Sequence, residues 1–339
     1  MIKKILVTGG NGFIGQNFLN FINKKKKYDI VNIDSLSGSS DRKAHKKFEN
    51  IRFYKENLIN KYKIKKIIIK FKPDLVVNFA AHSHVDKSIM NSEIFLENIV
   101  GTHNLLSVCL DLFRSKKNIK FLQVSTDEVF GSIKLGKFKS NSPYKPNSPY
   151  SASKASADHL VRAFNKTYSL PTLITYSCNN FGPYQHLEKL IPLTILSYLK
   201  KEKMGIYGKG NQKRQWIYVM DNVKAIYSLI GKKFTGKNFC IGSKNEMTNI
   251  DLVKKIIKII KKKNSILEND INFDNHIKYV KDRPGHDYRY NLDYQDLKKH
   301  TGWKEKYTLN QSLNLTIDWY LNNLKWIQDQ EKFLEKFKY

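Results

Sequence analysis

The chain has 339 residues, of which 41% are hydrophobic and 12% aromatic. This is enough to bury a substantial core, and it excludes an intrinsically disordered chain. The formal net charge is +30, yet only seven of the 60 basic residues are arginine. Nucleic-acid readers rely on the planar guanidinium group, and no binding motif accompanies the lysines. We therefore interpret the charge as a compositional bias and expect no specific nucleic-acid partner.

The cysteines and the N-terminus indicate the cellular compartment. Cys109, Cys178 and Cys240 lie far apart, which disfavours both a disulfide framework and a cysteine-based zinc site. The first apolar stretch is too short for a signal peptide, and no apolar run approaches the roughly 20 residues that span a bilayer. We expect a cytoplasmic protein that binds neither a membrane nor a metal.

Short apolar runs alternate with longer amphipathic stretches in the first half of the chain. The predicted strands are 5–8, 30–34, 51–54, 75–79, 121–125 and 172–176, and predicted helices between them include 13–23, 99–113 and 151–167. Strands that are apolar throughout are buried on both faces of a sheet. Their alternation with helices predicts an α/β fold with a Rossmann-like, doubly wound parallel sheet.

The pattern changes after Asn180. The later predicted elements are helices at 191–199, 222–230, 250–260 and 309–321, a turn at 208–211 and a strand near 239–241 that returns to the main sheet. No flexible linker separates the two parts. We expect residues 1–177 and 218–242 to form the sheet domain, and residues 178–217 and 243–339 to form a smaller, interleaved C-terminal domain.

A glycine cluster lies between the first predicted strand and the first predicted helix. Gly9, Gly12 and Gly15 fit one form of the dinucleotide fingerprint, and Gly10 in place of Gly9 fits the other. Glycine permits a tight turn and lets the backbone approach a pyrophosphate at the helix N-terminus. Asp34 ends the next strand, where its carboxylate would bind a ribose 2′-hydroxyl and repel a 2′-phosphate. The cluster predicts a dinucleotide site that prefers NAD to NADP.

Candidate catalytic residues lie in two segments near the middle of the chain. Tyr150 and Lys154 are four residues apart at the start of a predicted helix, so they share one face. Thr126 ends a predicted strand and is followed by Asp127 and Glu128. By itself the tyrosine–lysine spacing is common, and the acid pair is better explained as a helix start. Beside a nicotinamide site, however, a lysine and the positive ring would lower the pKa of the phenol, so that tyrosine could act as a base.

These motifs resemble those of the extended short-chain dehydrogenase/reductase family over nearly the whole chain. The segments that carry the resemblance are 9–15, 81–86, 125–129, 150–156, 179–180, 189–192, 206–210, Arg214 and 282–286. The Asp127–Glu128 pair and the segment 282–286 resemble the branch that dehydrates nucleoside-diphosphate glucoses. The resemblance implies NAD-dependent conversion of dTDP-glucose to its 4-dehydro-6-deoxy product, for deoxysugar biosynthesis. The alternatives are the same reaction on UDP-glucose, a sugar-nucleotide 4-epimerase or decarboxylase, and a non-catalytic nucleotide-binding protein.

The resemblance also implies a role for each catalytic residue. Tyr150 would take the proton of the 4-hydroxyl as a hydride leaves C4 for NAD⁺, with Thr126 bound to that oxygen and Lys154 tuning the phenol. Glu128 would remove the C5 proton, and a protonated Asp127 would donate to the departing 6-hydroxyl. The hydride would then return to C6, so the cofactor would stay tightly bound.

The implied binding residues fall into two sets. Those for the cofactor are Gly9, Gly12, Phe13, Ile14, Gly15, Asp34, Asn57, Leu58, Ala80, Ala81, His82, Tyr150, Lys154 and Asn180. Those for the nucleoside-diphosphate sugar are His84, Thr126, Asn179, Lys189, Leu190, Ile206, Tyr207, Arg214, Asn249, Asp282, Arg283 and His286. His286 is equally well explained as a structural turn residue.

The chain departs from the family pattern at two of these positions. Asn57 stands where the family usually has aspartate, and His82 where it usually has glutamate. Both changes affect cofactor affinity rather than the proposed chemistry. The resemblance further implies a homodimer, in which the predicted helices 99–113 and 151–167 of each copy form a four-helix interface.

Overall fold

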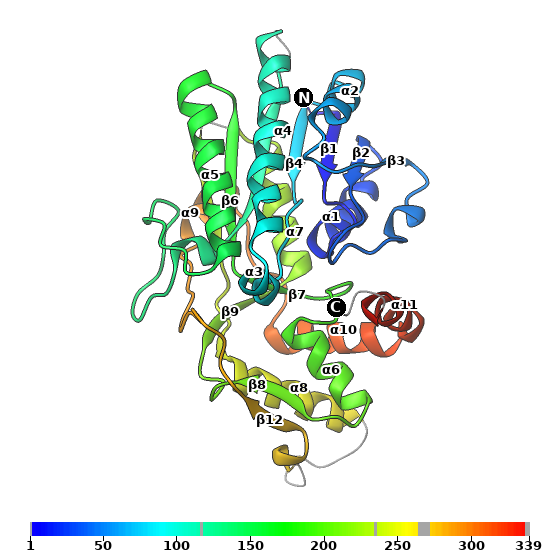
Figure 1. Cartoon of the computed structure of the whole chain (residues 1–339), viewed down its shortest axis with the longest axis vertical. Coiled ribbons are helices and arrows are strands. Elements are labelled where there is room, and N and C mark those ends of the chain that lie inside the picture. The colour runs from blue at the N-terminus through cyan, green and yellow to red at the C-terminus, as the bar shows by residue number, and fades with distance from the viewer. Residues whose placement is uncertain (1, 116–117, 234–235, 264–271, 336–339) are drawn as a thin grey trace.

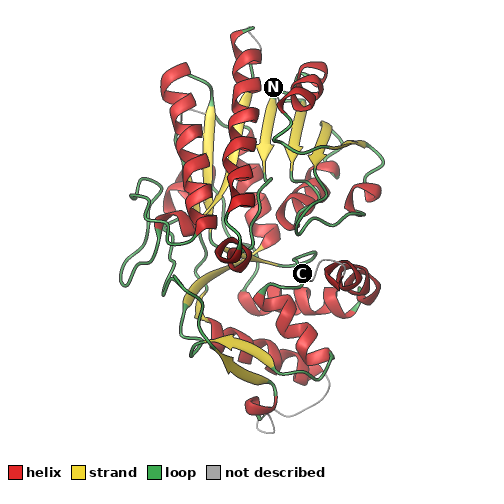
Figure 2. Ribbon diagram, in the orientation of Figure 1, coloured by secondary structure: helices red, strands yellow, loops and turns green. Residues whose placement is uncertain are grey.

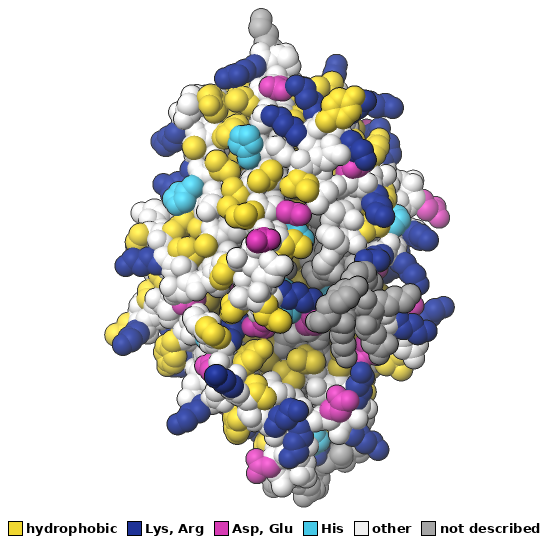
Figure 3. Space-filling view, viewed as in Figure 1, with side chains coloured by type: hydrophobic (Ala, Val, Ile, Leu, Met, Phe, Trp, Pro, Cys, Tyr) yellow, Lys and Arg dark blue, Asp and Glu magenta, His cyan; other side chains and the backbone are white. Residues whose placement is uncertain are grey.

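The structure is a computed structural model that describes residues 2–115, 118–233, 236–263 and 272–335. Figure 1 shows two lobes, with the large sheet and its helices in the upper one and mostly later residues in the lower one. The Lys and Arg side chains are scattered over the visible face (Figure 3). None of the described helices combines the length and the apolar composition needed to cross a membrane.

The main sheet has seven strands in the order β10-β6-β5-β4-β1-β2-β3, and every neighbouring pair is parallel. The strands are β1 (Lys4–Thr8), β2 (Asp29–Asp34), β3 (Ile51–Lys55), β4 (Leu75–Asn78), β5 (Lys120–Thr126), β6 (Thr172–Ser177) and β10 (Phe239–Ile241). Each predicted strand is confirmed to within one residue at either end. The winding direction reverses between β1 and β4, and open sheets of this kind bind ligands at the carboxyl ends of their strands beside such a reversal.

Helices cover both faces of this sheet (Figure 2). The helix α4 (Glu97–Arg114) contacts both α2 (Lys61–Phe71) and α5 (Pro149–Tyr168), and α1 (Phe13–Asn23) separately contacts α7 (Val219–Ile230). The prediction for α1 is confirmed residue for residue, whereas α7 begins three residues earlier than predicted and α2 was not predicted. Apolar side chains between the layers, such as Leu6, Val76 and Leu122, are fully buried.

The lower lobe is built from short strands and helices. A three-stranded sheet contains β7 (Asn179–Phe181), β9 (Lys213–Tyr218) and β11 (Glu246–Thr248), and a parallel pair contains β8 (Met204–Tyr207) and β12 (Ile277–Val280). The later helices are α6 (Leu190–Leu199), α8 (Asn249–Lys263), α9 (Gln295–Thr301), α10 (Leu309–Leu321) and α11 (Leu324–Glu335). The predictions of α6, α8 and α10 are confirmed, while β8, β12, α9 and α11 were not predicted. The domain boundaries stay a proposal.

Asp221 joins the C-terminal part of the chain to the first lobe. Its side chain, on α7, is 1% exposed. Its Oδ1 accepts a hydrogen bond from the backbone N–H of Lys306 and its Oδ2 from that of Tyr307, both at 3.1 Å. The indole N–H of Trp303 donates to the backbone carbonyl of Asp221 at 3.1 Å. One carboxylate therefore holds the segment that leads into α10.

Replacing Asp221 by alanine removes both side-chain acceptors. We expect Asp221→Ala to lower the free energy of unfolding by roughly 1–3 kcal/mol, because two backbone N–H groups lose their partner. Asp221→Asn keeps one acceptor and should cost less. Urea denaturation followed by circular dichroism measures both changes. Asp329→Ala, which removes an exposed ion pair with Lys43, is the control and should leave the midpoint unchanged. Equal midpoints for all variants would contradict this role of Asp221.

Candidate active site

The glycine turn between β1 and α1 is closely packed and is least crowded at Gly12. A Cβ on Gly9, which has φ +70°, would lie 2.6 Å from the backbone nitrogen of Ala80, and one on Gly15 would lie 2.2 Å from the carbonyl oxygen of Gly9. Packing therefore requires glycine at both. A Cβ on Gly12 would meet only the Gly9 oxygen, at 3.3 Å. Gly12 precedes the first turn of α1, so this least crowded position is where a phosphate would reach the helix N-terminus.

Asp34 is held rigidly at the carboxyl end of β2. Its side chain is 4% exposed. Oδ2 accepts from the backbone N–H of Asn11 at 2.9 Å, and Oδ1 from the N–H of Leu36 at 2.8 Å and the hydroxyl of Ser40 at 2.9 Å. Burial raises the pKa of Asp34, and these hydrogen bonds oppose the rise. Oδ2 keeps a lone pair for a further donor, such as a ribose hydroxyl.

The two departures from the family pattern converge on a carboxylate that the sequence analysis missed. The Nδ2 of Asn57 donates to Glu97 Oε2 at 3.0 Å, and His82 Nε2 lies 3.2 Å from the same oxygen. Glu97 begins α4, forty residues after Asn57. No spacing rule links residues so far apart, so the sequence offered no signal for it. Glu97 on α4 therefore places a carboxylate beside both Asn57 and His82.

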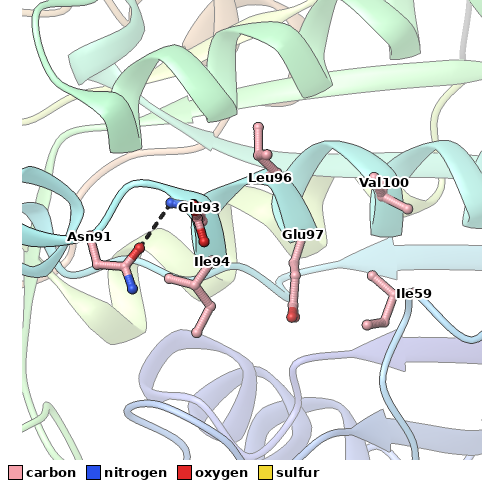
Figure 4. Close-up of a pocket in the computed structure, with 7 residues that line it drawn as sticks. All are labelled: Ile59, Asn91, Glu93, Ile94, Leu96, Glu97 and Val100. Carbon is pink, nitrogen blue, oxygen red and sulfur yellow. Dashed lines mark hydrogen bonds between the residues drawn. The ribbon is translucent and has the colours of Figure 1, made fainter.

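A cavity of about 430 Å³ opens beside this cluster (Figure 4). Its lining residues are Ile59, Asn91, Glu93, Ile94, Leu96, Glu97 and Val100. The remaining predicted cofactor residues of the first lobe follow the carboxyl ends of β1, β3 and β4. They are Phe13, Ile14, Leu58, Ala80 and Ala81. The structure therefore brings together the first-lobe residues of the predicted cofactor set along one edge of the sheet.

The acid pair follows β5 directly. Thr126 caps the short helix η3 (Asp127–Phe130): its hydroxyl oxygen accepts from the backbone N–H of Glu128 at 3.3 Å, and its hydroxyl donates to Asp127 Oδ1 at 3.2 Å. Asp127 is 2% exposed, and its Oδ2 has no hydrogen-bond partner among the described residues. Glu128 is only half-buried. The two carboxyl groups thus occupy different environments.

Burial raises the pKa of both groups, and nearby charges act differently on each. Burial raises the pKa of Asp127 to about 8, and the neighbouring Glu128 adds to the rise. Burial also raises the pKa of Glu128, but the cations of Arg283, Lys189 and Arg214 oppose it. Asp127 is therefore a neutral acid near pH 7, whereas Glu128 faces positive charge that stabilises its anion.

Tyr150 and Lys154 lie in the first two turns of α5. A capping box of Ser148 and Ser151 starts this helix, with Pro149 in its first turn. Tyr150 is 8% exposed and Lys154 4% exposed, and the Lys154 ammonium donates to the carbonyl of Val124 at 2.9 Å. Burial lowers the pKa of Lys154, and Asp158, one turn further along α5, raises it.

The expected lowering of the Tyr150 pKa does not arise within the chain. Burial raises this pKa, the charges of Glu128 and Asp127 raise it further, and a hydrogen bond with Thr126 lowers it. The physical reason is that the phenol is buried and faces two carboxyl groups, while the Lys154 ammonium donates its hydrogen bond to a backbone carbonyl. Tyr150 therefore needs a further positive charge beside it to act as a base.

His84 and Lys189 lie where the lobes meet. The Nδ1 of His84 accepts from the N–H of Lys87 at 3.3 Å and so caps α3 (Val85–Met90), while its Nε2 lies 3.0 Å from Glu188 Oε2. His186 Nδ1 lies 3.3 Å from the same oxygen of Glu188. The Lys189 ammonium donates to the carbonyl of Ser83 at 3.1 Å. Glu188, which orients His84, was not predicted.

Arg214 is buried rather than part of a surface salt bridge. Its side chain is 3% exposed and lies 4.1 Å from the ring centre of Tyr290. Its Nη1 donates to the carbonyl of Lys213 at 2.8 Å and its Nη2 to that of Asp287 at 2.8 Å. Part of the guanidinium fork therefore holds the chain, and its charge also acts on the acid pair.

The other predicted substrate residues are more dispersed. Arg283 Nη1 lies 3.5 Å from Asp86 Oδ1, across the gap between the lobes, and Tyr207 donates to the other oxygen of Asp86 at 3.4 Å. His286 Nδ1 lies 2.7 Å from Asp282 Oδ1. Ile206 is buried in a small second core, and Leu190 packs against that core. Asn249 begins α8, and Asn179 is half-buried on β7. Ile206 thus has a core position rather than an open one.

Asn180, also on β7, carries an unused acceptor. Its Nδ2 donates to the carbonyl of Cys178 at 2.9 Å. Its Oδ1 is buried and has no hydrogen-bond partner among the described residues. A buried amide oxygen without a donor is costly, so a bound group with an N–H or O–H would suit this position.

Comparisons with known proteins agree with this geometry. The family model described as GDP-mannose 4,6 dehydratase matches residues 6–316. A dTDP-glucose 4,6-dehydratase of Haemophilus influenzae is 41% identical over 95% of this chain and 99% of its own. The crystal structure of dTDP-glucose 4,6-dehydratase from Bacillus anthracis, in complex with NAD, has TM-score 0.84 at 38% identity and covers 97% of this chain and 99% of its own. The crystal structure of dTDP-glucose 4,6-dehydratase from Streptomyces venezuelae, with NAD and TYD bound, has TM-score 0.86 at 34% identity. It covers 95% of this chain and 98% of its own.

The fold and the arrangement of Thr126, Tyr150 and Lys154 at its sheet edge are those of a nucleotide-dependent dehydrogenase scaffold. The chain belongs to the extended short-chain dehydrogenase/reductase family and, within it, to the group of dTDP-glucose 4,6-dehydratase-like proteins. The resemblance inferred from the motifs is therefore confirmed.

The raised pKa of Asp127 predicts a pH-dependent cost to folding. The folded carboxyl has a pKa of about 8, whereas an unfolded aspartate titrates near ~3.9. As the pH rises between these values, the unfolded chain loses a proton that the folded chain keeps, so stability falls. Asp127→Asn removes this cost, and its stability should exceed the parent's increasingly from pH 4 to pH 8, on the order of 1.4 kcal/mol per pKa unit.

Urea denaturation of the parent and of Asp127→Asn across this pH range measures the difference. Asp251→Asn, at an exposed position of α8, is the control and should differ from the parent equally at every pH. A constant offset for Asp127→Asn would show that the folded protein holds Asp127 ionised.

Proposed function

We propose that the chain is an NAD-dependent dehydratase that converts dTDP-glucose to dTDP-4-dehydro-6-deoxyglucose, a precursor for deoxysugar biosynthesis. The observation that carries this proposal is the acid pair. Asp127 is buried and its raised pKa keeps it neutral, while Glu128 faces cations, and both lie beside Thr126 and Tyr150. An elimination of water needs an acid and a base of this kind next to the site of oxidation.

The residues present fit NAD. Gly12 is the least crowded glycine at the N-terminus of α1, Asp34 has a free lone pair for a ribose hydroxyl, and Asn180 Oδ1 lacks a donor among the described residues. Gly9, Gly15 and the residues at the ends of β3 and β4 would hold the rest of the dinucleotide. Bound NAD⁺ supplies a hydride acceptor and the positive charge that Tyr150 needs. Relatives solved with NAD support the same assignment.

The oxidation step uses Tyr150 and Thr126. Tyr150 takes the proton of the 4-hydroxyl as C4 gives up its hydride, and Thr126 binds the same oxygen. Lys154 contributes positive charge near the phenol, and Asp158 helps it to stay protonated. The resulting 4-ketone acidifies the C5–H bond.

The elimination step uses the acid pair. Glu128 removes the C5 proton, because the charges of Arg283, Lys189 and Arg214 stabilise its ionised form. Asp127 donates its proton to the 6-hydroxyl, which leaves as water. Glu128 then returns its proton to C5 as the hydride returns to C6.

The second lobe would hold the nucleoside diphosphate. Arg283 and Lys189 are cations near the acid pair and would attract its phosphates. Arg214 would act with the part of its fork that the backbone carbonyls leave free. His84, whose Nε2 lies 3.0 Å from Glu188 Oε2, and the half-buried Asn179 would contact the sugar.

UDP-glucose is the alternative substrate, because it carries the same diphosphate and the same sugar. A 4-epimerase or a decarboxylase would use Tyr150, Lys154 and the cofactor without needing a buried neutral acid next to a base. The environments of Asp127 and Glu128 therefore favour dehydration.

Mass spectrometry of separate reactions with dTDP-glucose and UDP-glucose tests the proposed function. We expect the protein to retain NAD on purification and to remove one water from dTDP-glucose. Glu128→Gln should reduce the rate by at least ~100-fold, because a general base is lost, while NAD retention stays unchanged. Conversion to a galactose isomer without mass change would contradict the dehydratase assignment. A preference for UDP-glucose would keep the chemistry and change the substrate.

We also propose that the protein is a homodimer through α4 and α5. These helices lie side by side at the surface (Figure 1), and hydrophobic side chains are visible on the face that they form (Figure 3). Leu96 and Val100 near the start of α4 are 58% and 46% exposed, and Tyr168 at the end of α5 is 40% exposed. A second copy of this face would cover them.

Analytical ultracentrifugation at micromolar concentration tests the dimer. The parent should sediment as a dimer, and Val100→Glu should shift it towards the monomer because a charge enters an apolar interface. Leu135→Glu, at a side chain that is 86% exposed in the loop before Phe138, is the control. A parent protein that sediments as a monomer would refute the proposal.

A further inference from the structure

The proposed reaction leaves two residues in the wrong protonation state after each turnover. Tyr150 gains the proton of the 4-hydroxyl, and Asp127 loses a proton to the departing 6-hydroxyl. Glu128 takes the C5 proton and returns it, and the hydride that leaves C4 returns at C6, so neither of these leaves a change. Before the next turnover, one proton must leave Tyr150 and one must reach Asp127. This reasoning rests on the proposed function.

The hydroxyl of Thr126 connects these two residues. It donates to Asp127 Oδ1 at 3.2 Å, and a hydrogen bond with Thr126 lowers the pKa of the Tyr150 phenol. The backbone N–H of Glu128 donates to the same hydroxyl oxygen at 3.3 Å and holds it in place. A hydroxyl group can accept one proton and release another, which is the property that a relay requires.

We propose that Thr126 transfers the surplus proton from Tyr150 to Asp127 and thereby resets both residues for the next turnover. The O–H bond of Tyr150 breaks and a new O–H bond forms on Thr126 Oγ, while the original proton of Thr126 moves to Asp127 Oδ1. Tyr150 becomes a phenolate, Asp127 becomes a neutral acid and Thr126 is unchanged. One proton has moved, no electrons have been exchanged, and no further reactant is needed.

Burial makes an internal route preferable to exchange with bulk water. Tyr150 is 8% exposed and Asp127 2% exposed. Asp127 is also the suitable acceptor, because burial and the neighbouring Glu128 raise its pKa, whereas three cations oppose the effect of burial at Glu128. Lys154 is directed elsewhere, to the carbonyl of Val124. The hydroxyl of Thr126 thus interacts with both the proton donor Tyr150 and the proton acceptor Asp127.

The test compares Thr126→Val with Thr126→Ser in the NAD-loaded protein. Valine keeps the shape of the side chain and removes the hydroxyl, while serine keeps the hydroxyl. Each protein is mixed rapidly with excess dTDP-glucose and quenched at successive times. For Thr126→Val we expect a burst of one product per active site, followed by turnover at least ~10-fold slower than the burst, as for loss of an acid–base group. The parent and Thr126→Ser should form product linearly.

Two further readouts separate a relay from mere binding of the substrate. After one equivalent of substrate, isotope-edited infrared spectroscopy should find Asp127 ionised in Thr126→Val and neutral in the parent. Added imidazole buffer should accelerate the slow phase of Thr126→Val and leave its burst unchanged, because a small acid–base pair can carry the proton instead. A residue that only positions the 4-hydroxyl would slow the burst and the later turnovers equally.

The outcomes distinguish the relay from the function on which it rests. If the parent forms no product from dTDP-glucose, the proposed function fails. If the parent dehydrates dTDP-glucose but Thr126→Val shows linear product formation with Asp127 neutral after one turnover, the relay is refuted and the function stands.

Discussion

The removal of one carboxyl group from water is the constraint on which the site depends. Asp127 follows β5, the strand beside β4 in the sheet, and its position at the strand end leaves it 2% exposed. An ionised carboxylate there would lack solvent, so the group stays neutral near pH 7. Arg214 of the second lobe acts on the same group, because its charge opposes the rise in pKa that burial causes. The two lobes therefore form one catalytic environment.

Adjacent residues differ in chemistry because they face different parts of the molecule. Asp127 is packed at the sheet edge, while the half-buried Glu128 faces cations from the loops around α6 and after β12. Thr126 joins them by capping η3 and by bonding to Asp127. Two adjacent residues of the chain can therefore act as an acid and as a base. The hydroxyl of Thr126 in turn interacts with both Asp127 and Tyr150.

The C-terminal helix supports the cofactor end of the site. The hydroxyl of Ser40 bonds to Asp34, and the loop that carries Ser40 continues to Asp41, whose Oδ2 accepts from the indole N–H of Trp326 at 2.9 Å. Trp326 lies on α11, so the last described helix braces the loop beside the glycine turn. At the other side of this region, Glu97 on α4 receives both Asn57 and His82. Both contacts link residues far apart in the sequence.

The sequence by itself determined the sheet, the glycine turn and the candidate catalytic residues, because these depend on local patterns. Continuous apolar runs identify buried strands to within a residue, and the spacing of Gly9, Gly12 and Gly15 follows from one turn. Only the tertiary structure decided how burial and charge shift the pKa of Asp127 and Glu128, the carbonyl contacts of Arg214 and the contacts of Glu97. Each of these arises where distant segments meet, and burial and charge at such contacts are not encoded in any short stretch of residues.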